Sequence, residues 1–202
     1  MSNTANPDFG AFFSPTPTQD TDLLQQLPFL PGLQELLLLR QVHGLEHATV
    51  WILDEMSKTQ NRPTDSDLLG GLSTEQGFYL YGEVNPLHLQ KAVPEALQRL
   101  QNGEWNLALH PRCGTNMSVA LLLTTGLALG TSFLLPRTPF EQLLGIGLAG
   151  FMANQLAPDM GNLTQRFITT AIPYNVAIQK ISRTTDFWGR PASFIQVSWH
   201  EG

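Results

Sequence analysis

The chain has one cysteine, Cys113, among 202 residues. An internal disulfide framework is therefore excluded, and the roles left for this thiol are a buried small group, a metal ligand or a nucleophile. Charged residues are also scarce, at 14% of the chain against about 25% in an average soluble domain. This low charge predicts that part of the chain lies in lipid.

Basic clusters are missing as well. The net charge is −6 and no block of Lys and Arg stands out, so nucleic acid is not an expected partner. The N-terminus lacks a basic stretch followed by an apolar run, and we expect no cleaved secretory signal. Residues 1–21 have little periodicity and are expected to form a disordered arm. No glycine loop of the kind that cradles a cofactor phosphate and no haem attachment pattern occurs.

Against these absences stands the segment from His43 to His47, which reads H-x-x-E-H. On an α-helix, positions i, i+3 and i+4 share a face, so His43, Glu46 and His47 are expected to point at one spot. The order is the inverse of the H-E-x-x-H zinc motif, in which two His bind zinc and the Glu acts as general base. The alternative is that the two imidazoles are polar packing groups.

A second candidate half-site is the segment from His110 to Asn116, with the sequence HPRCGTN. His110 and Cys113 could join His43 and His47 in a closed zinc site, or three of the four could leave one position open for water. The Gly-Thr-Asn turn places Cys113 just before a predicted helix, whose dipole favours a thiolate. Arg112 is a candidate contact for an anionic substrate, or for a lipid phosphate or Asp159.

These two segments resemble a bacterial membrane family described as predicted metal-dependent enzymes, which pairs an HGxEHK-type helix with an HPRCGT-type turn. The similarity continues weakly into a third stretch, at Leu163, Gln165, Arg166, Thr169 and Thr170. The chain resembles more closely an uncharacterised family from photosynthetic bacteria that shares the HGLEHA and HPRCGTN segments, over about residues 30 to 185. The resemblance implies a metal site but no particular reaction. Ala48 replaces the basic residue of the broader family.

Residues 117–135 form a segment of nineteen residues without one charge. As a helix it would be roughly 29 Å long, enough to cross the hydrocarbon core of a bilayer. A second apolar segment, residues 140–157, follows a Pro-rich turn, and glycines at G-x-x-x-G spacing would let the two helices pack closely. We predict a two-helix transmembrane hairpin over residues 115–158. The alternative is a buried hairpin in a soluble bundle.

The remaining segments predict a mainly α fold with a small α/β subdomain. Residues 22–114 are expected to form a helical and α/β domain, with a helical break near residues 28–32. Within it we expect a strand at 78–81, a helix capped by Asn85 and starting at Pro86, and a strand at 104–109. Residues 159–202 are expected to form a further helix and an aromatic tail.

Together these patterns favour a membrane-anchored metal-binding protein, with Zn²⁺ as the expected ion and a hydrolase using Glu46 as one interpretation. The alternative is a non-catalytic assembly or scaffold protein with a structural metal site or none. The expected partner is the lipid of a plasma or thylakoid membrane. All eleven Lys and Arg except Arg137 lie outside the hairpin, which predicts that the soluble parts face the cytoplasm.

Overall fold

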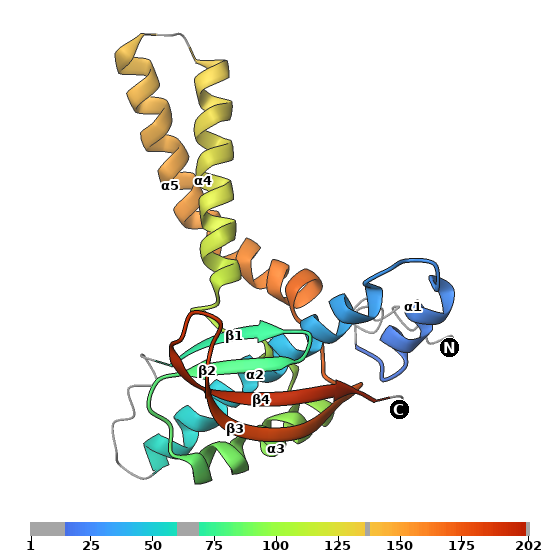
Figure 1. Ribbon diagram of the computed structural model, residues 1–202. Coiled ribbons are helices and arrows are strands. Elements are labelled where there is room, and N and C mark those ends of the chain that lie inside the picture. The colour runs from blue at the N-terminus through green and yellow to red at the C-terminus, as the bar shows by residue number, and fades with distance from the viewer. Residues whose placement is uncertain (1–14, 60–68, 136–137, 201–202) are drawn as a thin grey trace, which may run out of the picture.

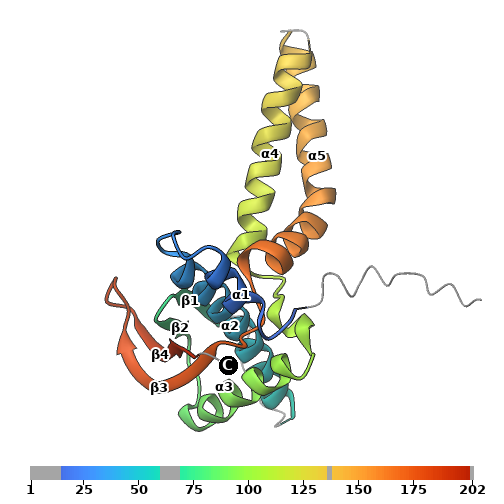
Figure 2. The ribbon, with the colours of Figure 1, turned by 90° about the vertical axis from the view of Figure 1, so that its right-hand side faces the viewer.

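The computed structural model describes residues 15–59, 69–135 and 138–200. A body of helices and one small sheet carries a long helical hairpin that projects away from it (Figure 1). Figure 2, turned by 90°, shows the same projection, with the hairpin clear of the body over most of its length. The fold is therefore mainly helical with a small sheet, as the sequence predicts.

Helix α2, Leu33–Thr59, is the central element of the body. It follows the shorter helix α1, Gln19–Gln26, and the break predicted near residues 28–32 is confirmed between them. Gly32, with φ of 79°, supplies the left-handed residue at this break. Half of α2 is buried, because it packs against the sheet and against α3, Pro86–Gln101. Residues 1–14 of the predicted arm lie outside the described residues, and the last residues of that prediction belong instead to α1, which begins at Gln19.

Four antiparallel strands form the sheet in the order β1-β2-β4-β3. These are β1 (Gly70–Thr74), β2 (Gly77–Tyr81), β3 (Val176–Thr185) and β4 (Pro191–Trp199). The strand expected at 78–81 is confirmed. The helix and aromatic tail expected at the C-terminus are wrong beyond Thr169, because the chain continues as β3 and β4. The alternating, β-branched sequence of β3 is compatible with a half-buried strand as well as with a helix. Pairing with β4 selects the strand.

The helix capped by Asn85 is also confirmed, since the Asn85 side chain accepts a hydrogen bond from the Leu87 backbone N–H at 2.9 Å. The strand expected at 104–109 is wrong. Residues Trp105–Ala108 form a 3₁₀ turn, η3, because the segment has no neighbouring strand to pair with in the described sheet. The largest buried side chains lie between α2, α3 and the sheet, and they are Leu45, Ile52, Phe78, Leu80, Leu89, Leu100 and Ile195.

The hairpin consists of α4, Gly114–Leu134, and α5, Pro139–Thr164, and it ends in a short π-helical turn, η4, Gln165–Thr169. A helical hairpin is thus present, but the prediction of two transmembrane helices is not supported. Among the described helices, only α4 is long and apolar enough to cross a membrane. Helix α5 fails because polar residues interrupt it towards both ends, and they are Glu141, Gln142, Asn154, Gln155, Asp159 and Asn162.

Candidate metal centre

Helix α2 brings the three residues of the H-x-x-E-H segment to one face. Glu46 and His47 are buried, and His43 is half-buried. The three side chains line one cleft of about 520 Å³ between α2, β1 and the start of α4. The helical spacing predicted from the sequence therefore holds.

Cys113 joins this face from the other half-site. It is the N-cap of α4, and its Sγ accepts a hydrogen bond from the Thr115 backbone N–H at 3.4 Å. The same sulfur lies 3.3 Å from Nε2 of His43. The first residue of the hairpin thus meets the central helix of the body.

His43, His47 and Cys113 are the group, among the described residues, whose ligand atoms could hold a metal ion, since these atoms lie within 4.8 Å of one another. Nδ1 of His43 lies 2.9 Å from the Thr169 carbonyl, and Nδ1 of His47 lies 2.7 Å from the Ala108 carbonyl. A carbonyl can only accept, so each Nδ1 donates, and Nε2 is the nitrogen of each ring that can bind a metal. Two imidazole nitrogens and one sulfur form a donor set that suits zinc, and backbone partners of this kind fix ligand imidazoles in metal sites.

The electrostatics of Cys113 point the same way. Burial opposes ionisation of its thiol, but hydrogen bonding and charge from His47, together with the Thr115 contacts, outweigh burial and leave its pKa below the ordinary value. A thiolate is the form that binds metal. The helix dipole of α4 adds to this effect at the N-cap position.

Glu46 lies beside this group, in the same cleft. Its carboxylate accepts a hydrogen bond of 2.5 Å from the Ser73 hydroxyl of β1, and it lies so close to Gly71 that a Cβ there would overlap it. Burial raises the pKa of Glu46, against the opposing effects of Ser73 and His43. The carboxylate is thus held by the sheet, while the imidazoles are held by backbone carbonyls of η3 and η4.

His110 lies in the same cleft, beside the three grouped residues. Its ring centroid lies 5.7 Å from that of His47 and 5.0 Å from that of Trp51, and its Nδ1 accepts from the Arg112 backbone N–H at 3.3 Å. Burial, followed by the charges of His47 and Arg112, lowers the pKa of His110 to about 4. The imidazole therefore lines the cleft in its neutral form, next to the three grouped ligands.

A buried glutamine holds the loop that carries Cys113. Gln165, in η4, accepts from the His110 N–H at 2.9 Å through Oε1, and its Nε2 donates to the His110 carbonyl at 3.1 Å and to Asn116 Oδ1 at 2.6 Å. Gly161 makes room for Asn116, since a Cβ at Gly161 would overlap that amide. Both ends of the hairpin are therefore tied to the same loop.

A family match covers this whole arrangement. Residues 38–181, which include both half-sites, match the family described as a domain of unknown function, DUF6391. The chain belongs to the DUF6391 family. An uncharacterised protein of Picosynechococcus sp. is 51% identical over 195 residues, which is 95% of each chain. No solved structure matches. The predicted resemblance to an uncharacterised family is confirmed, and the similarity to metal-dependent enzymes stays a prediction.

In this DUF6391 chain, the sequence pattern did not reveal several partners of the site. Ser73 and the carbonyls of Ala108 and Thr169 carry no motif, because any residue can supply a carbonyl. Gln165 and Thr169 do lie in the third stretch of the resemblance described above, and that stretch was the available signal for them. Gly44 was visible in the first motif, and its reason is now clear: a Cβ there would overlap the Ala171 carbonyl, just beyond η4.

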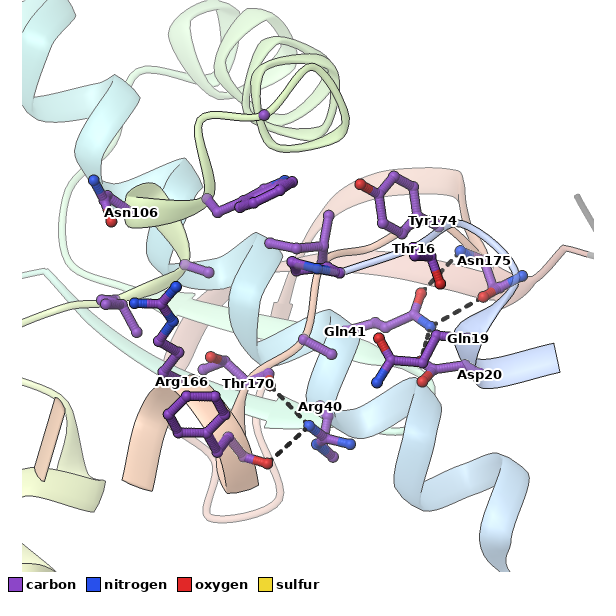
Figure 3. A pocket seen from close by; sticks show the side chains of 18 residues that line it. Thr16, Gln19, Asp20, Arg40, Gln41, Asn106, Arg166, Thr170, Tyr174 and Asn175 are labelled. Atoms are coloured by element: carbon purple, nitrogen blue, oxygen red, sulfur yellow. Dashed lines mark hydrogen bonds between the residues drawn. The ribbon is translucent and has the colours of Figure 1, made fainter. Parts of the chain in front are cut away.

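A second cavity, of about 230 Å³, lies beside α2 at Arg40 and Gln41 (Figure 3). Gln41 donates to Asp20 at 2.5 Å and to the side chain of Asn175 at 3.2 Å, and it accepts from the Asn175 backbone N–H at 2.9 Å. Arg40 donates to the Phe167 and Thr170 carbonyls, at 3.2 Å each. These pairings tie α1, η4 and the segment before β3 to α2, so we interpret them as structural.

Proposed function

We propose that this protein is a membrane-anchored metal-binding protein that holds a zinc ion with His43, His47 and Cys113. The observation that carries the proposal is the placement of their ligand atoms within 4.8 Å of one another. The two Nδ1 contacts to backbone carbonyls support it, because they leave Nε2 as the nitrogen of each ring that faces the candidate ion position. The lowered pKa of Cys113 favours the anionic ligand.

Three protein ligands leave one tetrahedral position open, which is typical of catalytic zinc sites. In that position a bound zinc ion would lower the pKa of a water molecule. Glu46 faces the same cleft and is held by Ser73, so it is the side chain placed to take a proton from such a water. Arg112 lines the cleft and could contact an anionic group of a substrate. The reaction class that these roles favour is hydrolysis.

One observation favours a second function, a non-catalytic scaffold with a structural metal. His110 lines the same cleft with its ring centroid 5.7 Å from that of His47, so a small change of the loop would bring in a fourth ligand. Four ligands close a zinc site and remove the position for water. Such a site would fasten α2 to the first turn of the hairpin.

The hairpin supports the membrane part of the proposal. Helix α4 has no buried residue, and its mean hydropathy of 1.7 suits lipid. Because α5 returns the chain to the body, a crossing by α4 requires α5 to accompany it, with its polar residues near the two surfaces. The Lys and Arg of the body would then face the cytoplasm, in a plasma or thylakoid membrane.

Elemental analysis of purified protein tests the metal site. We expect about one zinc per chain in the wild type and loss of zinc in His47→Ala and in Cys113→Ser. His200→Ala is the matched control, since His200 is exposed and its contacts are made by its backbone. Folded wild-type protein that binds no divalent metal would contradict the proposal.

Two further variants separate the catalytic site from the structural one. In a hydrolase, Glu46→Gln keeps the metal and loses turnover in an activity screen, whereas His110→Ala keeps the metal. In a structural site, His110→Ala lowers zinc affinity together with thermal stability, and Glu46→Gln changes neither.

Flotation with liposomes tests the anchor. Leu122→Asp combined with Leu129→Asp places two charges on the exposed face of α4 and should abolish flotation, because each costs about 3 kcal/mol within a bilayer. Leu87→Asp, at an exposed position of α3, should float like the wild type. Equal flotation of all three proteins would contradict the proposed anchor.

A further inference from the structure

The cleft at the metal centre has polar side chains in its middle and apolar side chains on both sides of them. Its α2 wall is a stripe at helical spacing, in which Leu36 and Leu39 precede His43, and Val50 follows His47. Leu36 lies seven residues from His43, or about 10 Å along the helix, which is the length of an extended chain of roughly eight carbon atoms. The donor groups therefore stand beside an apolar track of defined length, and Arg40 on the same wall donates to the Phe167 and Thr170 carbonyls.

Other elements complete this track. Leu72 of β1 and Ile168 of η4 line the cleft opposite and beside α2. Leu36 is 54% exposed and Ile168 is 64% exposed, so the apolar end of the cleft opens to the surroundings. Large apolar side chains left open beside a cleft are typical of a site that takes an apolar ligand.

The walls of the cleft continue into the hairpin. Cys113, Gly114 and Thr115 begin α4, and Ile168 and Thr169 belong to the turn that ends α5. Figure 1 shows α4 leaving the body beside β1, at the foot of the hairpin. A hairpin inserted in a bilayer would therefore set the open end of the cleft at the lipid surface.

We propose that the cleft binds a single-chain amphiphile drawn from the membrane, with an oxygen-bearing head at the metal ligands and an acyl tail along Leu36, Leu39 and Ile168. This inference rests on the proposed function, since the metal must be present to receive the head. The apolar track suits an acyl tail, because it would bury the methylene groups of the tail. It also gives the ligand a chain-length preference.

Cobalt-substituted protein in lipid nanodiscs provides the test, because detergent would compete for the same cleft. Acetohydroxamate and octanohydroxamate offer the same metal-binding head with tails of different length, and each is titrated against the cysteinate-to-cobalt absorption band. We expect octanohydroxamate to bind at least about 30-fold more tightly, since its additional methylene groups become buried. Hexadecanohydroxamate supplied in the nanodisc lipid should shift the same band.

The double variant Leu36→Gln/Ile168→Gln should reduce the chain-length ratio to below about 5-fold while leaving cobalt content and acetohydroxamate affinity unchanged. Leu87→Gln is the matched control, because it is 65% exposed on α3 and lies outside the cleft. Equal affinity for the two hydroxamates in cobalt-loaded protein would overturn the amphiphile proposal and leave the metal site standing. Protein that takes up no cobalt would overturn both.

Discussion

The body and the hairpin bury opposite kinds of side chain. In the body, large apolar residues such as Leu45 and Phe78 are inside. In the hairpin, the buried residues of α5 are all small and recur every fourth position, and they are Gly145, Ala149, Ala153, Ala157 and Gly161. Most large apolar side chains of both hairpin helices are exposed.

This difference supports the proposal that the two regions are built for different solvents. Burial of large apolar groups stabilises the body in water. A ridge of small residues lets two backbones approach closely, which is how helices associate when the surroundings are as apolar as their side chains. The candidate metal centre lies where the regions meet, because α2 supplies His43 and His47 and the first cap of the hairpin supplies Cys113.

The largest expected effect is the loss of stability when a large side chain is removed from the core of the body. Leu45→Ala, at a position with 0% exposure, should lower the free energy of unfolding by about 2–5 kcal/mol through lost burial and a cavity. Leu122→Ala, at a position with 72% exposure on α4, should change it by less than about 0.5 kcal/mol. Thermal unfolding in nanodiscs, followed by circular dichroism, measures both. Equal losses of stability in the two variants would mean that the Leu122 side chain is packed against protein, as the Leu45 side chain is.

The junction between the regions gives the next effect. Gln165→Leu removes the hydrogen bonds to His110 and Asn116, so the loop bearing Cys113 loses its hold on η4. We expect zinc affinity to fall about 10- to 100-fold, as it does when groups that orient metal ligands are removed. A competition titration with a zinc chelator measures this change. Gln155→Leu, at an exposed position of α5, is the control and should bind zinc like the wild type.

The hairpin ridge should respond to the opposite kind of change from the core. Ala153→Leu enlarges a buried small residue facing α4 and should cost about 1–3 kcal/mol, because overpacking pushes the helices apart. Leu148→Ala removes an exposed side chain and should have little effect. Hydrogen exchange of the α4 and α5 amides in nanodiscs measures the difference. Faster exchange in Leu148→Ala than in Ala153→Leu would show that the ridge is not the packing surface.

The sequence predicted the elements whose signals are local. The break before α2, the Asn85 cap and the shared helical face of His43, Glu46 and His47 all follow from spacing and capping rules. The meeting of His43 with Cys113 could only be proposed, because seventy residues separate them. The ability of both side chains to bind metal suggested that they meet. The packing of the start of α4 against α2 brings them together.

The errors lie where tertiary pairing decides the outcome. Residues 176–185 could form an amphipathic helix or a strand, and only β4, itself hidden in an apparent aromatic tail, selects the strand. The segment Trp105–Ala108 has strand-like composition, but no described strand pairs with it, and it closes into a 3₁₀ turn. His110 as a metal ligand stays a prediction, and its Nδ1 accepts from the Arg112 backbone N–H in a turn that sequence spacing does not specify.

The smallest expected effect concerns pH and the junction again. Because burial first, and then His47 and Arg112, lower the pKa of His110 from 6.5 to about 4, the unfolded chain binds a proton that the folded chain refuses between these values. The stability of metal-free protein should therefore fall as pH drops from 6.5 towards 4, and this contribution should level off below pH 4. Thermal unfolding of EDTA-treated protein across this range measures it.

His110→Asn isolates this contribution, because the Asn side-chain oxygen can replace Nδ1 as the acceptor for the Arg112 N–H but cannot be protonated in this range. The variant should lose less stability than the wild type between pH 6.5 and 4, whereas His200→Asn should follow the wild type. Identical profiles for all three would mean that His110 is hydrated at the mouth of the cleft. The junction between the body and the hairpin would then be open to water. The candidate metal centre would in that case lack the buried surroundings that the body provides elsewhere.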